Sequence, residues 1–292
     1  MPGLTLLVIG DPAAGFLRPL DRLPRDVRVI VSDDRERLGE SAPEADVILQ
    51  AGFSDRTLLR HVFHHASARL KWIHIVAAGV EQSLTPEIVE SSVPVTNGRG
   101  LWQRPLAEWA IGAMIYFTYD FRQLIRNQEA GRWEQFVHPE LHGQNLTVVG
   151  YGSIGREIAM LARGFNMRIS AVRRNPAPDP LLDACFTPAQ IDEAVSQADF
   201  IAVSSPLTKE TRGLIGEAQI ASMKDSAVIV NVGRGAVVDE PALISALEHK
   251  RIRGAALDVF AKEPLHEGHP FYKLDNVLLS PHIADKVPGK RA

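Results

Sequence analysis

The 292-residue sequence has a single cysteine, Cys185, which excludes an internal disulfide framework. A chain without disulfides suits a reducing compartment, so we expect a cytoplasmic protein. The sequence also lacks an apolar run long enough to span a bilayer. Its first apolar run has no basic segment before it and ends at Asp11-Pro12, too early for a secretory signal peptide. We therefore expect no membrane partner.

A large excess of charge of one sign is also lacking. The chain carries 32 Lys and Arg residues against 35 Asp and Glu residues, a formal net charge of -3. Proteins that bind nucleic acid usually show a basic surplus, because they neutralise phosphates. The near balance of charges therefore argues against a nucleic-acid partner, and a hydrophobic content of 45% is typical of a globular protein.

Clusters with the composition of a metal site are scarce as well. His61, His64 and His65 have the spacing of ligands on one helix face, but no acidic or cysteine partner adjoins them. We interpret them as a solvated basic helix face and predict no metal site. His266 and His269 stand in a segment with glycine and proline, where we expect a surface loop.

Short apolar runs alternate with helical patterns in the first third of the chain. Strands of a parallel sheet are buried on both faces, so such runs need no alternation of polar and apolar residues. We expect strands at Leu4–Gly10, Val27–Ser32, Ala45–Gln50, Leu70–Ala78 and Val93–Asn97, with helices that include Thr57–Ala68 and Pro86–Ser91. This pattern predicts a first α/β domain over residues 1–98.

The alternation starts again at Leu146 and predicts a second parallel sheet. The next expected strands are Met167–Arg173, Asp199–Ser204, Ser226–Val232, Gly254–Val259 and Asn276–Leu279, and the expected helices are Ser153–Arg163, Pro188–Ser196 and Glu240–Lys250. The chain is therefore expected to form two doubly wound α/β domains, the second a Rossmann nucleotide domain over residues 99–282.

Residues 105–127 join the two series of strands. Pro105 at a first-turn position, with the long mixed apolar stretch after it, predicts one continuous helix that extends towards Gly131. The predicted helix is rich in aromatic residues. This composition suits an interdomain or subunit contact, and it suits simple core packing equally well.

A glycine-spaced turn follows the first strand of the second series. Gly150, Gly152 and Gly155 fit the dinucleotide fingerprint, in which they make the tight turn, admit a pyrophosphate and allow close helix packing. Ser153 and Ile154 open the next helix, whose N-terminal N–H groups attract the phosphates. A plain strand-to-helix turn would also accommodate these glycines.

The end of the next strand indicates which dinucleotide binds. NAD-specific domains place an acid about twenty residues after the glycine turn, whereas arginine there accommodates a 2′-phosphate. This sequence has Arg173 and Arg174 at that point and no acid. Guanidinium groups bind a phosphate through charge-assisted hydrogen bonds. We expect a preference for NADP(H), with NAD(H) as the alternative cofactor and a solvated strand end as the alternative interpretation.

Four motifs in a fixed order resemble those of the D-isomer-specific 2-hydroxyacid dehydrogenase family. They are Gly150–Gly155, Val228–Asp239, Ala255–Pro264 and Leu279–Ala284, and Val76–Glu81 and Ser205–Ile215 also fit family patterns. Within the family, the arginine pair and the Ala-Ala-Gly-Val loop are most similar to glyoxylate/hydroxypyruvate reductases. The resemblance covers nearly the whole chain. It implies a flavodoxin-like substrate domain before the Rossmann domain, a small 2-oxo acid as substrate, and a homodimer formed through the long helix.

The resemblance also implies that Arg234 binds the substrate, that His282 is the acid/base and that Glu263 is its partner carboxylate. General chemistry supports these roles. A guanidinium fork binds the carboxylate of a 2-oxo acid and polarises the ketone. The alkoxide left by hydride transfer needs a proton from a group that titrates near neutrality, and a bonded carboxylate orients an imidazole and raises its pKa. Taken singly, each residue fits an ordinary turn or solvated loop.

Further contacts are implied by the same resemblance. The backbone of Ala78, Gly79 and Val80 would bind the substrate carboxylate opposite Arg234, in a cleft between the domains. Asp258 would accept a hydrogen bond from the nicotinamide amide, unless it only caps its strand. The remaining expected cofactor contacts are Ser205, Pro206, Thr211, Val232 and Gly233.

The family pattern continues beyond the His282 motif with a helix that returns to the first domain, whereas this sequence ends at Ala292 after a polar, basic tail. We expect residues 283–292 to lie with the first domain and some apolar surface of that domain to stay uncovered. The expected activity is NADPH-dependent reduction of glyoxylate or hydroxypyruvate. Two alternatives are an NAD-linked dehydrogenase of a larger or phosphorylated 2-hydroxy acid, and a nucleotide-sensing relative without catalysis.

Overall fold

The computed structural model describes residues 3–51, 55, 57–81 and 83–287, which form two compact units. The first unit runs to Trp102 and also includes Val287, and the second runs from Gln103 to Lys286, so the chain changes units slightly later than the expected boundary after residue 98. Of the tail expected with the first domain, residues 283–286 lie in the second unit. Residues 288–292 lie outside the described residues.

The first unit contains a five-stranded parallel sheet in the order β2-β1-β3-β4-β5. Its strands are β1 (Thr5–Ile9), β2 (Arg28–Ser32), β3 (Val47–Gln50), β4 (Trp72–Ile75) and β5 (Val95–Asn97). Its helices are η1 (Gly15–Arg22), α1 (Arg35–Ser41), η2 (Ala42–Glu44), α2 (Thr57–His65) and α3 (Pro86–Glu90). The expected strands and helices are confirmed.

The two faces of this sheet bury different side chains, because successive residues of a strand point to opposite faces. On β1, Leu7 lies in a core cluster with buried residues of α1, α2 and α3. Its neighbours Leu6 and Val8 belong to a second cluster, against which apolar side chains of η1 pack. Both faces of β1 are therefore apolar, as expected for a doubly wound sheet.

The second unit contains a seven-stranded parallel sheet in the order β12-β11-β10-β9-β6-β7-β8. Its strands are β6 (Asn145–Val149), β7 (Arg168–Val172), β8 (Ala184–Phe186), β9 (Phe200–Val203), β10 (Val228–Asn231), β11 (Gly254–Leu257) and β12 (Val277–Leu279). The six expected strands are confirmed, and β8 is additional. The strand order reverses between β6 and β9, and open α/β sheets bind ligands at the carboxyl edge beside such a point.

Helices flank this second sheet. They are α4 (Gln103–Thr118), α5 (Phe121–Glu129), α6 (Ser153–Arg163), α7 (Ile191–Ser196), α8 (Glu217–Ser222) and α9 (Glu240–Glu248), with the 3-10 helices η3 (Pro188–Gln190), η4 (Gly235–Val237) and η5 (Pro270–Lys273). The bounds of α6 are those expected from the sequence. Helix α4 packs against α6 and β10 and so belongs to the second unit.

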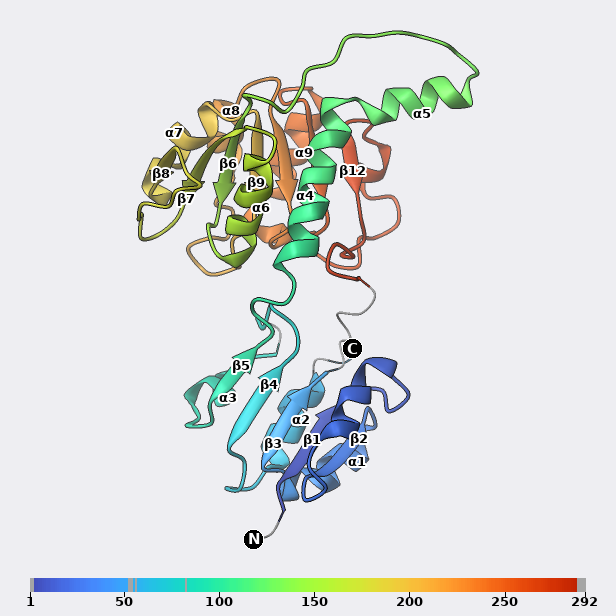
Figure 1. Ribbon diagram of the computed structural model, residues 1–292, viewed down its shortest axis with the longest axis vertical. Coiled ribbons are helices and arrows are strands. Elements are labelled where there is room, and N and C mark those ends of the chain that lie inside the picture. Colours follow the sequence, from blue (N-terminus) through green and yellow to red (C-terminus); the bar gives the residue numbers. More distant parts are fainter. Residues whose placement is uncertain (1–2, 52–54, 56, 82, 288–292) are drawn as a thin grey trace. The chain divides into compact units, whose positions relative to one another are not determined.

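The expectation of one long helix over residues 105–127 is wrong, because the helix breaks before Phe121. Asp120 adopts a left-handed backbone conformation with φ 47°, which a continuing α-helix does not allow. Its side chain then accepts a hydrogen bond from the N–H of Gln123 (3.2 Å) and caps α5. Helix α5 and the segment after it extend away from the body of the second unit (Figure 1).

None of the helices that the structure describes has the length and apolar composition needed to cross a membrane.

Candidate active site

The glycine turn between β6 and α6 has the local geometry expected of a dinucleotide cradle. Gly150 has φ +96°, and a Cβ there would lie 2.4 Å from the Oγ of Ser205. At Gly155 a Cβ would lie 2.5 Å from the carbonyl oxygen of Gly150, so this glycine lets α6 approach β6 closely. At Gly152 a Cβ would meet no atom of the described chain within 4 Å. The turn is therefore tight behind Gly150 and Gly155 and open at Gly152.

Open space at Gly152 lies directly before Ser153, the first residue of α6. The first N–H groups of a helix have no partner within the helix, and they carry a partial positive charge. Ser153 and Ile154 are half-buried at this end of the helix. The arrangement fits a bound pyrophosphate, because donors and unfilled space occur at the same place.

The carboxyl ends of the neighbouring strands complete the floor of this cradle. Ser204 donates its hydroxyl to the carbonyl of Gly150 (2.8 Å), and Ser205 donates to Val149 (3.1 Å). A Cβ at Gly233 would lie 2.9 Å from the carbonyl oxygen of Ser205, so these two backbones are in close contact. Three segments, after β6, β9 and β10, thus meet at one edge of the sheet.

The other expected cofactor contacts lie on the same segments. Val232 follows β10 directly and is 3% exposed. Thr211 donates its hydroxyl to the carbonyl of Pro206 (2.6 Å) and accepts from the N–H of Thr208 (2.8 Å). These contacts close the loop after β9, so Thr211 has a structural role whether or not it contacts a cofactor.

Arg173 follows the last residue of β7, and its guanidinium lies over the ring of Tyr151, 5.9 Å from the centroid. At this distance a cation–π attraction orients the guanidinium. Arg174 is exposed beside it. Asp179 pairs instead with Arg156 (3.1 Å), which keeps its carboxylate in an ion pair. The end of β7 is therefore basic, as the sequence predicts.

Sequence reasoning missed Tyr151, although an aromatic residue between the first two glycines of the fingerprint is a readable signal. The side chain is 8% exposed. Burial raises the pKa of Tyr151 to about 12, and the Asp179 carboxylate adds to this increase. Tyr151 is therefore a neutral, rigid platform under Arg173.

Arg234 is the third residue after the end of β10, in a turn that Asn231 shapes. The Asn231 side chain accepts from the N–H of Gly233 (3.0 Å) and donates to the carbonyl of Arg234 (3.1 Å). The guanidinium of Arg234 donates to the carbonyl of Gly233 (2.7 Å). Asn231 is buried, so its hydrogen bonds tie the backbone turn at Arg234 to the core of the second unit.

Glu263 and His282 form a hydrogen-bonded pair. Nδ1 of His282 lies 2.7 Å from Oε2 of Glu263, and Oε1 of the same carboxylate accepts from the N–H of Phe260 (3.0 Å). Burial raises the pKa of Glu263, but the hydrogen bonds from His282 and Phe260 and the nearby charges of His282 and Arg234 lower it overall. These interactions favour the charged carboxylate, and Arg234 is close enough for its charge to lower the pKa of Glu263.

The same pair changes the titration of the imidazole. The hydrogen bond with Glu263 raises the pKa of His282, burial opposes the increase, and the charges of Glu263, Asp258 and Asp285 add to it. His282 is 38% exposed at its side chain, so the ring remains accessible to a substrate. A half-buried imidazolium on a carboxylate is well suited to donate a proton.

Asp258 holds the turn that carries His282. It is fully buried, and its carboxylate accepts from the hydroxyl of Ser280, from the N–H of Ile283 (2.9 Å) and from the N–H of Ala284 (3.2 Å). Its carbonyl accepts from the N–H of His282 (2.9 Å), which has φ 53°. A left-handed conformation is costly for a residue other than glycine, and these bonds maintain it. Burial raises the pKa of Asp258.

Similarity to known proteins identifies the family of this chain. The family model for the NAD-binding domain of D-isomer specific 2-hydroxyacid dehydrogenases matches residues 111–284. A glyoxylate reductase of Pyrococcus furiosus is 34% identical over 264 residues, which are 85% of this chain and 76% of that protein. The chain belongs to this family. It is therefore an NAD(P)-dependent enzyme of the 2-hydroxyacid dehydrogenase and 2-oxoacid reductase class.

Two further relatives differ in what their names state. A D-3-phosphoglycerate dehydrogenase of Methanocaldococcus jannaschii is 34% identical over 262 residues, 88% of this chain but 49% of that protein. A D-isomer specific 2-hydroxyacid dehydrogenase of Xanthobacter autotrophicus Py2, solved with NADPH and MES, is 26% identical. Its structure superimposes with a TM-score of 0.83 over 100% of this chain and 91% of its own. The two-domain α/β fold of the family is thus confirmed.

In this 2-hydroxyacid dehydrogenase, the expected site residues fall on both units. The residues from the glycine turn to His282 lie at the carboxyl edge of the second sheet. Ala78, Gly79 and Val80 follow β4 in the first unit and are half-buried. The side chain of Asn97 donates to the carbonyl of Ala78 (2.6 Å) and so holds this loop against β5.

One histidine differs from expectation. His269 is 6% exposed and therefore does not lie in a surface loop as predicted. Its Nε2 atom lies 3.2 Å from Oε1 of Glu240, and its ring packs against Phe271 with centroids 4.9 Å apart. Phe271 is itself fully buried and draws the segment inward, which the glycine and proline nearby do not reveal. His266 is exposed, as expected.

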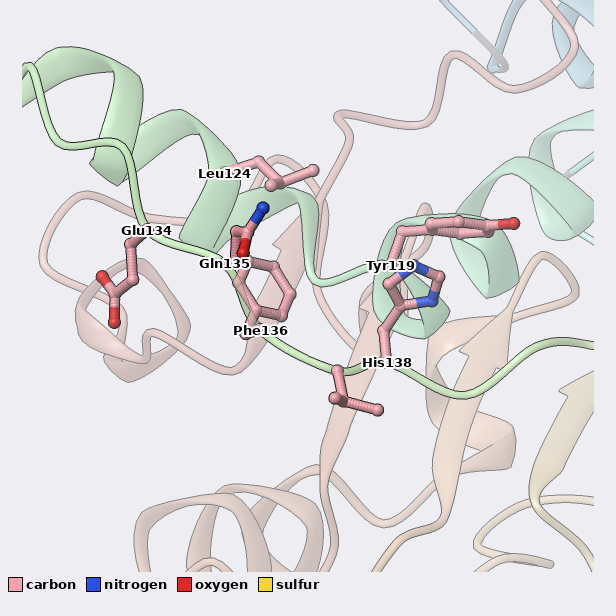
Figure 2. Close-up of a pocket in the computed structure, with 7 residues that line it drawn as sticks. Tyr119, Leu124, Glu134, Gln135, Phe136 and His138 are labelled. Carbon is pink, nitrogen blue, oxygen red and sulfur yellow. The ribbon is translucent and has the colours of Figure 1, made fainter.

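A hollow of about 570 Å³ lies elsewhere in the second unit, between α5 and the segment that follows it. Figure 2 shows Tyr119 and His138 on one side of it and Leu124 and Phe136 on the other. The rings of Tyr119 and His138 are in contact, with centroids 4.2 Å apart and planes tilted by 42°. The expected catalytic residues do not line this hollow, so its size is no indication of the active site.

Proposed function

We propose that this dehydrogenase reduces a small 2-oxo acid, such as glyoxylate or hydroxypyruvate, to the 2-hydroxy acid with NADPH. The observation that carries the proposal is the 2.7 Å contact between His282 and Glu263 at the carboxyl edge of the nucleotide-binding sheet, with the charge of Arg234 nearby. An acid, a carboxylate that supports it and a guanidinium are the groups that reduction of a 2-oxo acid needs.

Arg234 binds the substrate in this proposal. Its guanidinium forms charge-assisted hydrogen bonds with the carboxylate of the 2-oxo acid and polarises the adjacent ketone. The backbone of Ala78, Gly79 and Val80 provides further N–H donors to the carboxylate. Support for this part comes from the family resemblance, and the turn shaped by Asn231 gives Arg234 a defined direction.

His282 supplies the proton. The cofactor, when bound, supplies a hydride to the ketone carbon. The developing alkoxide then takes the proton that His282 carries, and Glu263 stabilises the imidazolium beforehand and holds its Nδ1 side, so that Nε2 faces the substrate. In this proposal Asp258 holds the His282 turn and, by the family resemblance, also accepts a hydrogen bond from the nicotinamide amide.

The preference for NADPH is part of the proposal. Arg173, oriented by the ring of Tyr151, and the exposed Arg174 bind the 2′-phosphate, because a guanidinium gives that group several charged donors. Asp179, near this strand end, is paired with Arg156, which offsets its negative charge. The NADPH named with the Xanthobacter structure supports the same choice.

A second candidate is an NAD-linked dehydrogenase of a larger or phosphorylated 2-hydroxy acid, as the name of the Methanocaldococcus jannaschii relative suggests. Oxidation of NADPH and of NADH against a panel of glyoxylate, hydroxypyruvate and 3-phosphohydroxypyruvate separates the two. The proposal expects the highest kcat/KM with NADPH and one of the two small acids. Preference for the phosphorylated acid with NADH would favour the second candidate, and binding without turnover would favour a nucleotide sensor.

We also propose that the enzyme is a homodimer in which α5 and the segment after it cover a second copy. The side chains of this projecting segment are unusually exposed for apolar residues: Leu124 is 44% exposed, Ile125 50%, Trp133 94% and Val137 100%. Several large apolar side chains exposed on one projecting segment favour an interaction site there. A second copy is the occupant that the family resemblance implies.

A further inference from the structure

We propose that Glu240 and His269 are positioning residues for the proton-donating pair: they hold the loop that carries Glu263 against the segment that carries Arg234. The inference rests on the proposed role of His282 as the proton donor. Both residues act through other groups, and neither belongs to the set of site residues that the family resemblance implies.

Glu240 contacts the loop between β11 and η5, residues 258–269, at two points. Its Oε1 atom lies 3.2 Å from Nε2 of His269, at the end of the loop. Its Oε2 atom accepts from the N–H of Ala261 (3.2 Å), in the first half of the loop. Residues 258–269 are described throughout and contain no helix or strand, so these contacts hold a loop that regular backbone bonding does not.

The point held by Glu240 adjoins the groups of the active site. Phe260, one residue before the Glu240 contact, donates its N–H to Oε1 of Glu263 (3.0 Å), whose other oxygen contacts His282. On the other side, a Cβ at Gly235 would lie 1.9 Å from the carbonyl carbon of Phe260. The backbone after Arg234 therefore rests directly on the backbone that positions Glu263.

The neighbours of His269 indicate which tautomer its neutral ring adopts. Its Nδ1 atom accepts from the N–H of Phe271 (3.3 Å), so in the neutral ring the proton is on Nε2 and is donated to Glu240. The side chains of His269 and Glu240 are only 7% and 19% exposed. A hydrogen bond to a carboxylate gains strength where water is largely excluded.

Glu240 is also the first residue of α9, so its position is set by a regular element. A carboxylate at this position is favoured by the positive end of the helix dipole. The segment from Arg234 to Glu240 thus carries the substrate-binding guanidinium at one end and the anchor of the Glu263 loop at the other. Loss of the anchor should displace Glu263 and disturb His282 without removing either group.

The test is the titration of His282 in the full-length chain, followed by NMR of the histidine ring protons and assigned with the His282→Asn variant. Glu240→Ala should lower the pKa of His282 towards its ordinary value, since Glu263 is its main support. The charges of Asp258 and Asp285 stay in place and continue to raise the pKa of His282, so the decrease should be partial. In turnover, kcat should fall about ten- to a hundredfold, because a displacement of about 1 Å of a catalytic group has effects of that size, while KM for NADPH should stay unchanged.

Two variants separate positioning from simple stability. Asp34→Ala removes the N-cap of α1 in the first unit, where Asp34 accepts from the N–H of Arg37 (2.8 Å), and should lower Tm without moving the titration of His282. His269→Gln keeps a donor towards Glu240 and should behave as wild type, whereas His269→Ala should behave as Glu240→Ala. If Glu240→Ala does not fold, His269→Ala serves as the test variant.

A wild-type titration of His282 in folded Glu240→Ala or His269→Ala would overturn the inference. Failure of the proposed function looks different. In that case the wild-type enzyme would turn over none of the 2-oxo acids, while Glu240→Ala would still shift the titration of His282.

Discussion

Nδ1 of His282 lies 2.7 Å from Oε2 of Glu263, although the two residues belong to different loops, one after β11 and one after β12. A third residue positions each member of the pair. The N–H of Phe260 donates to the Glu263 carboxylate, and the carbonyl of Asp258 accepts from the N–H of His282. In the proposed mechanism, the pair is already formed before substrate binds, which lowers the reorganisation that the chemical step would otherwise require.

Replacement of His282 by Asn should abolish most of the chemistry and preserve cofactor binding. General acid catalysis contributes about 10²–10⁴-fold to a rate, so we expect kcat for glyoxylate or hydroxypyruvate to fall within that range. His142→Gln, at an exposed position, is the matched control and should retain activity. Initial rates with saturating NADPH measure both variants, and near wild-type turnover of His282→Asn would refute its assignment.

The pH dependence of reduction should depend on Glu263. Reduction needs protonated His282, so kcat/KM falls as the pH rises through the raised pKa of His282. Glu263→Gln removes the hydrogen bond of the charged carboxylate, which is the largest cause of that increase, and should move the falling limb to lower pH. The rate in the direction of oxidation should show the opposite limb, because it needs neutral His282. A limb that stays in place in Glu263→Gln would contradict the pairing.

Cofactor choice should follow the basic end of β7. Combined replacement of Arg173 by Asp and of Arg174 by Ala should lower the ratio of kcat/KM for NADPH over NADH by at least about tenfold, since hydrogen bonds to charged groups contribute roughly 1.5–3 kcal/mol each. Arg168→Ala, at the exposed start of the same strand, is the control. An unchanged ratio would mean that the arginines are only a solvated strand end.

Replacement by alanine should affect stability at one glycine of the turn and NADPH binding at another. A Cβ at Gly155 would lie 2.5 Å from a backbone oxygen, so Gly155→Ala should lower the free energy of unfolding by about 1–3 kcal/mol, as overpacking usually does. A Cβ at Gly152 meets open space in the described chain, so Gly152→Ala should fold normally and bind NADPH more weakly. Denaturant unfolding and fluorescence titration with NADPH measure the two effects. Normal NADPH affinity in Gly152→Ala would argue against a pyrophosphate at this point.

The homodimer should depend on the exposed side chains of α5. Leu124→Asp combined with Ile125→Asp places charges on a surface that we expect to be buried, and light scattering should show a monomer mass. Val89→Asp, at a position 66% exposed in the first unit, is the control and should leave the mass unchanged. A monomeric wild-type protein at micromolar concentration would refute the dimer itself.

Much of the fold could be predicted because parallel sheets impose a local signature. Their strands are short apolar runs followed by glycine or polar residues, as at Val148 and Val149 before Gly150, and the helix after this turn begins and ends where expected. The break at Asp120 was not predictable from the apolar pattern, which continues through it. Only the left-handed backbone and the capping contact with Gln123 separate α4 from α5.

The residues of the candidate site were predictable by type and motif, since each of them follows a strand end. The neighbouring side chains that position them were not predictable from the sequence. His269 looks like a loop histidine in a segment with glycine and proline, yet Phe271 buries it against Glu240. Tyr151 likewise shows its relation to Arg173 only once β6 and β7 lie side by side.

The amino-acid sequence by itself determined the class of fold, the glycine turn and the chemical groups available for reduction, because these depend on local backbone preferences and on residue type. Tertiary structure decided which of those groups meet. Glu263 supports His282, Asp258 holds a left-handed histidine, and Glu240 anchors a loop that has no regular structure. These contacts join segments far apart in the chain, and they form only when neighbouring parallel strands bring their carboxyl ends to one edge of the sheet.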